Sequence, residues 1–157
     1  MLIFVPRERR AGETRVAATP ETVKKLLGQG FQIAVEPEAG ASAHFRDSDY
    51  ESAGAKLESF DDAWPRADVV LTLGPLEADA ARRLKESSVV IGLLAPYRSD
   101  AAIRSMLERK VTSLSLELVP RTTRAQPMDA LSSQASIAGY KAVLLAAAQL
   151  GKYFPLL

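Results

Sequence analysis

The stretch ADVVLTLGPLEADAARRLKESSVVIGLLAPYRSDAAIRSMLERKVTSLSL, residues 67–116, decides the fold class. It contains three short apolar runs, at 67–73, 88–94 and 111–116. Their length and content of branched aliphatic residues are typical of buried strands. Residues 77–85 and the segment that follows Ser99 have the spacing of amphipathic helices. This alternation predicts an α/β fold, a parallel sheet with helices on both faces.

The alternation continues toward both ends of the chain. On the N-terminal side we expect strands at 2–5 and 31–35. Thr19 is placed to cap a helix that has Pro20 in its first turn, and Ser48 to cap a shorter helix that ends at Ala53.

On the C-terminal side, residues 133–150 predict one long helix, about 27 Å at 1.5 Å per residue. Its middle is rich in alanine and leucine, which favour helix. We expect Gly151 and Pro155 to end it.

Composition excludes several classes of site. The chain has 157 residues, the size of one domain, and its 20 basic and 19 acidic residues argue against a nucleic-acid surface. It has no cysteine and one histidine, His44, so thiol catalysis and two-histidine metal sites are excluded and no metal is expected. No apolar stretch reaches membrane-spanning length, and we expect a soluble, cytoplasmic protein.

The chain lacks a glycine-rich phosphate cradle of its own. Gly28-Gln29-Gly30 has the spacing that starts a dinucleotide fingerprint, but it follows a helix and leads into a strand. It is better interpreted as a helix end and turn. No Walker lysine motif and no Gly-x-Ser-x-Gly elbow is present.

Two long polar loops follow predicted strands, at 6–19 and 117–132. In parallel sheets ligands bind outside the carboxyl ends of the strands. The first loop either forms a solvated charged face or directs an arginine, best Arg15, at an anion. The second loop is suited to hold a carboxamide, a pyrophosphate or a protein surface; equally, Asp129 and the serines after it could simply cap the long helix.

Four stretches make the chain recognisable. They are ELVPRTTRAQPMDALSSQASIAGYKAV (117–143), PRERRAGETRVAATPETV (6–23), VEPEAGASA (35–43) and YESAGA (50–55). They resemble the proton-translocating NAD(P) transhydrogenase family, in the N-terminal region of its NAD(H)-binding alpha subunit, and the resemblance covers essentially the whole chain.

The resemblance implies a domain organisation. In that family a discontinuous flavodoxin-like first domain and a Rossmann domain flank a cleft. By analogy, residues 1–132 form the first domain with its catalytic loop, and 133–151 form a connector helix. The NAD-binding Rossmann domain, which carries the glycine fingerprint and the main NAD(H) site, is then absent from this chain.

The resemblance also assigns roles. Asp129 and Ser132 would orient the carboxamide of NAD(H), and Arg121 would lie near the nicotinamide and the phosphates. Gln126 would reach toward NADP(H) on the partner component, and Tyr140 would face the site. Pro127, which follows Gln126, departs from the family pattern and is expected to push Gln126 away from helical backbone.

The partners implied are the second NAD-binding domain, the membrane-spanning and NADP-binding components and a second copy in a homodimer. The complete complex would then hold this domain peripheral to the inner membrane. The reaction implied is hydride transfer between NAD(H) and NADP(H) coupled to proton translocation, with the isolated chain inactive.

Two alternatives remain. Alanine dehydrogenase shares this architecture and uses an arginine, a lysine and a histidine, whose positions fall on Arg15, on or near Thr72, and near Leu94. Because the lysine and the histidine are missing, amino-acid oxidation would lack its proton acceptor. The other alternative is a non-catalytic module that only dimerises or binds a partner, driven by the apolar residues of the long helix.

Overall fold

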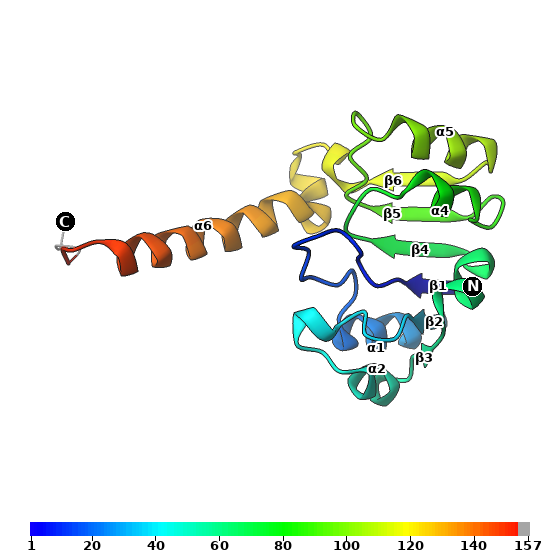
Figure 1. Cartoon of the computed structure of the whole chain (residues 1–157), viewed down its shortest axis with the longest axis horizontal. Coiled ribbons are helices and arrows are strands. Elements are labelled where there is room, and N and C mark those ends of the chain that lie inside the picture. The colour runs from blue at the N-terminus through cyan, green and yellow to red at the C-terminus, as the bar shows by residue number, and fades with distance from the viewer. Residues whose placement is uncertain (154–157) are drawn as a thin grey trace. The chain divides into compact units, whose positions relative to one another are not determined.

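The computed structural model describes residues 1–153, which fall into two units. The first unit spans Met1–Ser115 and the second begins at Leu116. The described part of the first unit holds a six-stranded parallel sheet (Figure 1). Its strands are β1 (Leu2–Val5), β2 (Gln32–Val35), β3 (Lys56–Leu57), β4 (Val69–Thr72), β5 (Val89–Gly92) and β6 (Thr112–Ser115).

The strands lie in the order β3-β2-β1-β4-β5-β6, which is the order of a Rossmann-type doubly wound sheet. Ile3 of β1 pairs with Ile33 on one side and with Val69 on the other, so β1 lies at the centre. The predicted fold class is therefore confirmed. Since the chain winds away from β1 in both directions, the carboxyl ends of β1 and β4 flank the point where the strand order reverses.

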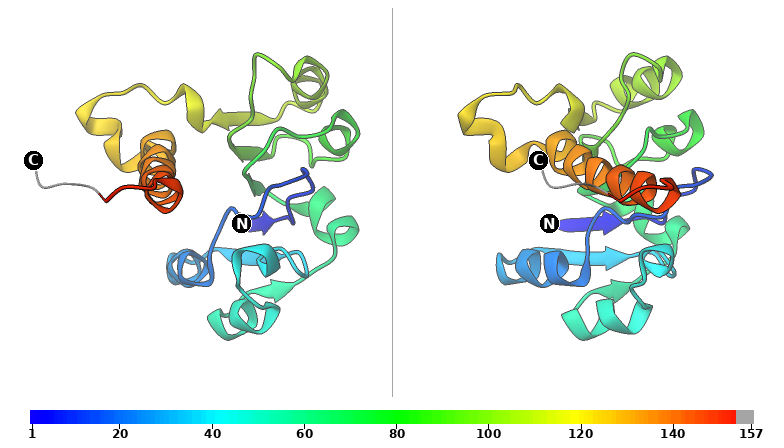
Figure 2. Two further views of the ribbon diagram at one scale, coloured as in Figure 1. Left: turned by 60° about the vertical axis from the view of Figure 1, so that its left-hand side comes forward. Right: turned by 90° about the vertical axis from the view of Figure 1, so that its left-hand side faces the viewer.

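Helices cover both faces of this sheet (Figure 2). They are α1 (Pro20–Gly28), α2 (Asp47–Ala53), α3 (Phe60–Ala63), α4 (Ala78–Arg82) and α5 (Asp100–Glu108). Val23 of α1 and Tyr50 of α2 pack with one face of the strands. Leu84, just after α4, and Met106 of α5 pack with the other face, against the buried Trp64. The two cores explain why β1, β2 and β4 are apolar on both sides.

Local signals were accurate at α1 and inaccurate at α2. The Thr19 side chain accepts a hydrogen bond from the Thr22 amide, as expected of the cap. Gly30 follows the helix end with φ +87°, and its amide donates to the Leu27 carbonyl, which confirms the turn. The predicted cap at Ser48 is wrong, because α2 already begins at Asp47.

The second unit contains the short 3₁₀ helices η3 (Leu116–Leu118) and η4 (Thr123–Met128), followed by the long helix α6 (Ala130–Gln149). The expected long helix is confirmed, but it begins at Ala130 rather than Ser133. The expected end at Pro155 lies outside the described residues. Within the described part of the chain, no helix is long and apolar enough to cross a membrane.

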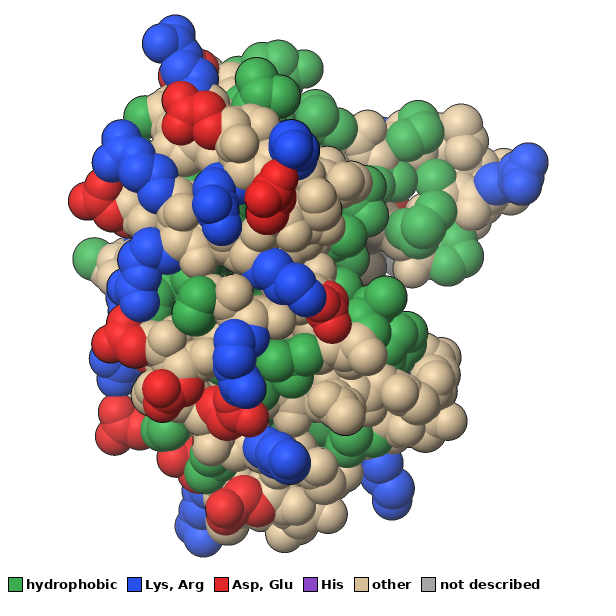
Figure 3. Space-filling view, turned by 90° about the vertical axis from the view of Figure 1, so that its right-hand side faces the viewer, with side chains coloured by type: hydrophobic (Ala, Val, Ile, Leu, Met, Phe, Trp, Pro, Cys, Tyr) green, Lys and Arg blue, Asp and Glu red, His purple; other side chains and the backbone are tan. Residues whose placement is uncertain are grey.

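Charged side chains on the first unit are mixed in sign. On the face drawn in Figure 3, basic and acidic groups are interspersed over the surface. Several pair directly, such as Arg83 with Asp61 and Lys85 with Asp68, both at 2.5 Å. Mixed surfaces of this kind favour solubility rather than binding of one long polyanion.

Candidate functional site

The loop from Pro120 to Asp129 is shaped by its own backbone. The Thr122 amide donates to the Pro120 carbonyl, and the Ala125 amide donates to the Thr122 carbonyl. These turns lead into η4, whose single buried residue, Ala125, packs inward. Gln126 and Pro127 both lie within η4, so the expectation that Pro127 keeps Gln126 out of helical backbone is wrong. The short helix therefore leaves the polar side chains of the loop directed outward.

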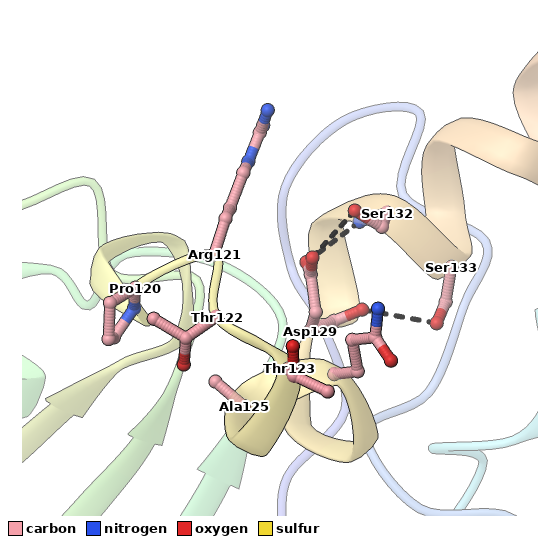
Figure 4. A pocket seen from close by; sticks show the side chains of 9 residues that line it. Pro120, Arg121, Thr122, Thr123, Ala125, Asp129, Ser132 and Ser133 are labelled. Atoms are coloured by element: carbon pink, nitrogen blue, oxygen red, sulfur yellow. Dashed lines mark hydrogen bonds between the residues drawn. The ribbon is translucent and has the colours of Figure 1, made fainter.

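These side chains surround a cavity of about 390 Å³. It is lined by Pro120, Arg121, Thr122, Thr123, Ala125, Gln126, Asp129, Ser132 and Ser133 (Figure 4). All nine come from the second unit, and seven of them are polar or charged. The volume falls in the range of small-molecule sites.

Asp129 joins the cavity to α6. Its carboxylate accepts hydrogen bonds from the amide of Ser132 at 2.9 Å and from the hydroxyl of Ser132 at 2.6 Å. The hydroxyl of Ser133 donates to the Asp129 carbonyl at 3.1 Å. Asp129 is thus the N-cap of α6, so the capping interpretation left open by the sequence is confirmed.

The same hydrogen bonds fix the charge of Asp129. Those from Ser132 lower the pKa of the Asp129 carboxyl below its ordinary value, and the Arg121 guanidinium lowers it further. An ionised carboxylate only accepts hydrogen bonds, so at neutral pH this group presents its remaining lone pairs to donors. The Ser132 hydroxyl, whose proton is directed at Asp129, keeps its own lone pairs for another donor.

Two polar groups of the loop are uncommitted among the described residues. Neither the Arg121 guanidinium nor the side-chain amide of Gln126 has a hydrogen bond or ion pair there, and both residues are exposed. Arg121 extends away from the cluster formed by Asp129, Ser132 and Ser133 (Figure 4). A loop with a cation, an amide and a carboxylate at one cavity can bind a ligand that is polar on several sides.

Four of the five residues predicted for the site come together around this cavity: Arg121, Gln126, Asp129 and Ser132. Tyr140 does not line it. Tyr140 follows Ser132 by eight positions, about 12 Å along the helix axis, and is 69% exposed. Its predicted role stays a prediction.

Sequence analysis did not single out Thr122 and Thr123, which add two hydroxyl groups to the lining. Their position directly after Arg121 in the sequence could have indicated that they belong to the site.

The lysine and histidine positions of the alanine dehydrogenase alternative, Thr72 and Leu94, carry no acid or base. Leu94 is buried in the apolar core. The Thr72 hydroxyl lies within 3.1 Å of the Glu8 carboxylate, to which it donates. Arg15 is bound to Glu13, with Nε and Nη2 each 2.7 Å from a carboxylate oxygen. No group of three potential metal ligands occurs among residues 1–153.

Comparison with known proteins gives consistent results. Residues 4–138 match the family model described as alanine dehydrogenase/PNT, N-terminal domain. The chain is 37% identical, over 154 aligned residues, to the NAD(P) transhydrogenase subunit alpha of Haemophilus influenzae; the match covers 98% of the chain and 30% of that protein.

A crystal structure of transhydrogenase from Sinorhizobium meliloti superposes with a TM-score of 0.92 at 39% identity, covering 100% of this chain and 47% of that one. Alanine dehydrogenase 1 of Staphylococcus aureus is 34% identical over 139 residues, which is 87% of this chain and 37% of the enzyme. The chain thus spans less than half the length of each of these relatives.

Proposed function

This chain belongs to the alanine dehydrogenase/PNT N-terminal domain family, and from that premise we propose that it supplies the nicotinamide-orienting loop of an NAD(P) transhydrogenase alpha subunit. The complete enzyme would transfer hydride between NAD(H) and NADP(H) and couple the transfer to proton translocation. One observation carries the proposal: Arg121, Gln126 and Asp129, with Ser132, line a single cavity.

The donor set fits a nicotinamide. The carboxamide group offers N–H donors and a carbonyl acceptor. Asp129 and Ser132 provide acceptors for the N–H groups, since the carboxylate is ionised and the serine lone pairs are available. Gln126 can donate and accept. When bound, the nicotinamide ring supplies the hydride chemistry itself.

The chain contributes position and charge. Asp129 is held by α6 through Ser132, so a carboxamide bound there is held in a fixed orientation. The exposed guanidinium of Arg121 offers N–H donors and a positive charge to phosphate oxygens or to negative charge near the ring. Gln126 lies at the part of the loop that would face NADP(H) on the partner component.

The connection from β1 to α1 indicates that another domain holds most of the cofactor. No glycine-rich turn leads from β1 into α1, where a Rossmann-type sheet usually binds pyrophosphate. We infer that a second, NAD-binding domain carries the main NAD(H) site, and that residues 133–151 connect the two. The membrane-spanning and NADP-binding components and a second copy of the subunit would complete the assembly.

The test is Gln126→Ala in a complete alpha subunit assembled with its partners. We expect hydride transfer to slow by about tenfold or more, while the Kd for NADH changes by less than about threefold, because Gln126 would position rather than anchor the ligand. Gln149→Ala, at the far end of α6, is the matched control and should leave both unchanged. Unaltered turnover in Gln126→Ala would refute the role.

A second measurement tests the missing domain. NADH titrated into the 157-residue chain alone should show no saturation below about millimolar concentration, because a single loop offers few contacts. Micromolar binding would place the main site within these residues. Absence of alanine-dependent NADH formation by the complete protein would separate this function from the alanine dehydrogenase alternative.

A further inference from the structure

The short helix η4 divides its side chains among three faces. A 3₁₀ helix has three residues per turn, so residues three positions apart share a face. Thr123 and Gln126 share the first face, and both line the cavity. Ala125 lies on the second face and is buried. The third face carries Arg124 and Pro127, which are exposed and do not line the cavity.

Arg124 is a cation that its own unit does not use. Its side chain is exposed and has no hydrogen bond or ion pair in the described part of the chain. Residues 116–153 contain two carboxylates, Glu117 and Asp129, and Asp129 is held by Ser132. Arg124 therefore contributes no ionic contact to the fold.

The second unit is also the more basic of the two. Its described residues carry four basic and two acidic side chains, whereas residues 1–115 carry 16 basic and 17 acidic ones. The excess of positive charge therefore lies in the unit that holds the polar loop. Charge complementarity favours an acidic surface on whatever protein covers this loop.

The place of Arg124 beside Gln126 indicates which protein that is. Arg124 precedes Gln126 by two positions, about 4 Å along the helix axis. Under the proposed function, on which this inference rests, Gln126 reaches toward NADP(H) on the partner component. A component that brings its ligand to Gln126 also covers the adjoining face of η4 and removes water from Arg124. Because an unpaired buried guanidinium is costly, a stable contact requires an acceptor on the partner.

We propose that the face of η4 that carries Arg124 and Pro127 docks the NADP(H)-binding component, and that a carboxylate of that component pairs with Arg124. The ring of Pro127 fixes the local backbone, which limits the conformational entropy lost on docking. Arginine is enriched among the residues that dominate the energy of an interface. Arg124 thus holds the partner protein, while Gln126 and the other residues of the cavity hold the ligands.

The experiment separates assembly from turnover. The complete alpha subunit is titrated against a fixed amount of its partner components, and hydride transfer is recorded at each concentration. Arg124→Gln should raise the half-saturating concentration by about tenfold or more, because a desolvated charge pair is lost. The maximal rate should change by less than about twofold, and the Kd for NADH should stay the same, since Arg124 does not line the cavity.

Two further variants test the chemistry of the contact. Arg124→Lys keeps the charge but loses the planar fork, so its half-saturating concentration should lie between those of wild type and Arg124→Gln. Arg104→Gln on α5 is the matched control, because Arg104 is also exposed and has no hydrogen bond or ion pair among the described residues. It removes the same charge and should leave the titration unchanged. Added salt should narrow the difference between wild type and Arg124→Gln.

The proposal is overturned if Arg124→Gln leaves the half-saturating concentration unchanged, or if it lowers only the maximal rate. It is also overturned if Arg104→Gln weakens assembly as much, since the effect would then be one of net charge. Gln126→Ala in the same titration should lower the maximal rate with little effect on half-saturation. An unchanged maximal rate in Gln126→Ala would refute the proposed function, whereas a lowered rate there with no effect of Arg124→Gln would refute the docking face alone.

Discussion

The loops after β1 and after β6 are both long, polar and rich in arginine, but they satisfy their polar groups differently. In the first loop, residues 6–15, each arginine contacts a glutamate of the same unit. In the second, Arg121, Arg124 and the Gln126 side chain have no hydrogen-bond or ion-pair partner among the described residues. The first loop is shaped before any ligand arrives, whereas the second leaves its polar groups available to one.

Glu8 shows how firmly the first loop is anchored. Its carboxylate accepts from the Leu73 amide at 2.6 Å and from the Thr72 hydroxyl at 3.1 Å, which ties the loop to the end of β4. Glu36, buried after β2, accepts from the Arg7 amide at 2.8 Å. Buried acceptors matched to donors are costly to disturb. Substitutions that break these anchors should therefore cost stability, and substitutions in the second loop should not.

The largest effect on stability is expected for Gly92→Ala in β5, which would disturb the contact between Glu8 and the end of β4. A Cβ atom there would lie 2.1 Å from the Thr72 carbonyl oxygen, so the two strands must separate and Thr72 must shift away from Glu8. We expect a loss of about 3 kcal/mol or more in the free energy of unfolding, measured by urea denaturation. Gly28→Ala, where nothing lies within 4 Å, is the control and should be near neutral. An equal effect of both would mean that the anchor is irrelevant.

The next effect is expected for Glu13→Gln. Hydrogen bonds from the Arg15 guanidinium lower the pKa of Glu13 from 4.5 to about 2. Because the folded-state pKa is depressed, the stabilisation is complete above the unfolded value of 4.5 and is lost as the pH falls toward 2. At pH 7 the variant should be less stable by about 2 kcal/mol. The difference in the free energy of unfolding between wild type and variant should disappear as the pH falls toward 2.

The control for this pH dependence is Glu21→Gln. Glu21 pairs with Lys25 on the surface of α1, and its side chain is 77% exposed. Exposed pairs contribute little because solvent screens them. A gap for Glu13→Gln that persists unchanged at pH 2 would contradict the ionic origin of the anchor.

A smaller and local effect is expected for Asp129→Ala in the second loop. Loss of the N-cap should fray the first turn of α6, so hydrogen exchange at Ser132 and Ser133 should accelerate by about fivefold. Asp129→Asn retains a capping oxygen and should exchange nearly as slowly as wild type. If either variant lowered the stability of residues 1–115, the separation between the two loops would be wrong.

Sequence analysis was most accurate where the pattern is long or the cap is explicit. Apolar runs of four to seven residues predicted β1, β2, β4, β5 and β6, and Thr19 with Pro20 predicted the start of α1. It missed β3 and α3, because a strand of two residues and a helix of a single turn show no periodicity.

The second loop could be predicted as a cluster because its residues are close in sequence. Gln126 lies in η4, Asp129 at the junction and Ser132 in the first turn of α6, so the local chain brings them together without any long-range contact. Tyr140 could not be placed in this way, because α6 carries it about two turns beyond Ser132.

The smallest effect on stability should come from Arg121→Gln combined with Gln126→Ala. Neither side chain has a hydrogen bond or an ion pair among the described residues, so no buried group is left without its partner, and the change should stay within about 0.5 kcal/mol. The same pair of changes should impair the complete enzyme. A ligand-binding loop needs polar groups that are free to bind a ligand and contribute nothing to folding. The stability of the double variant is measured by urea denaturation. A clear loss of stability would show that the loop has a structural role instead.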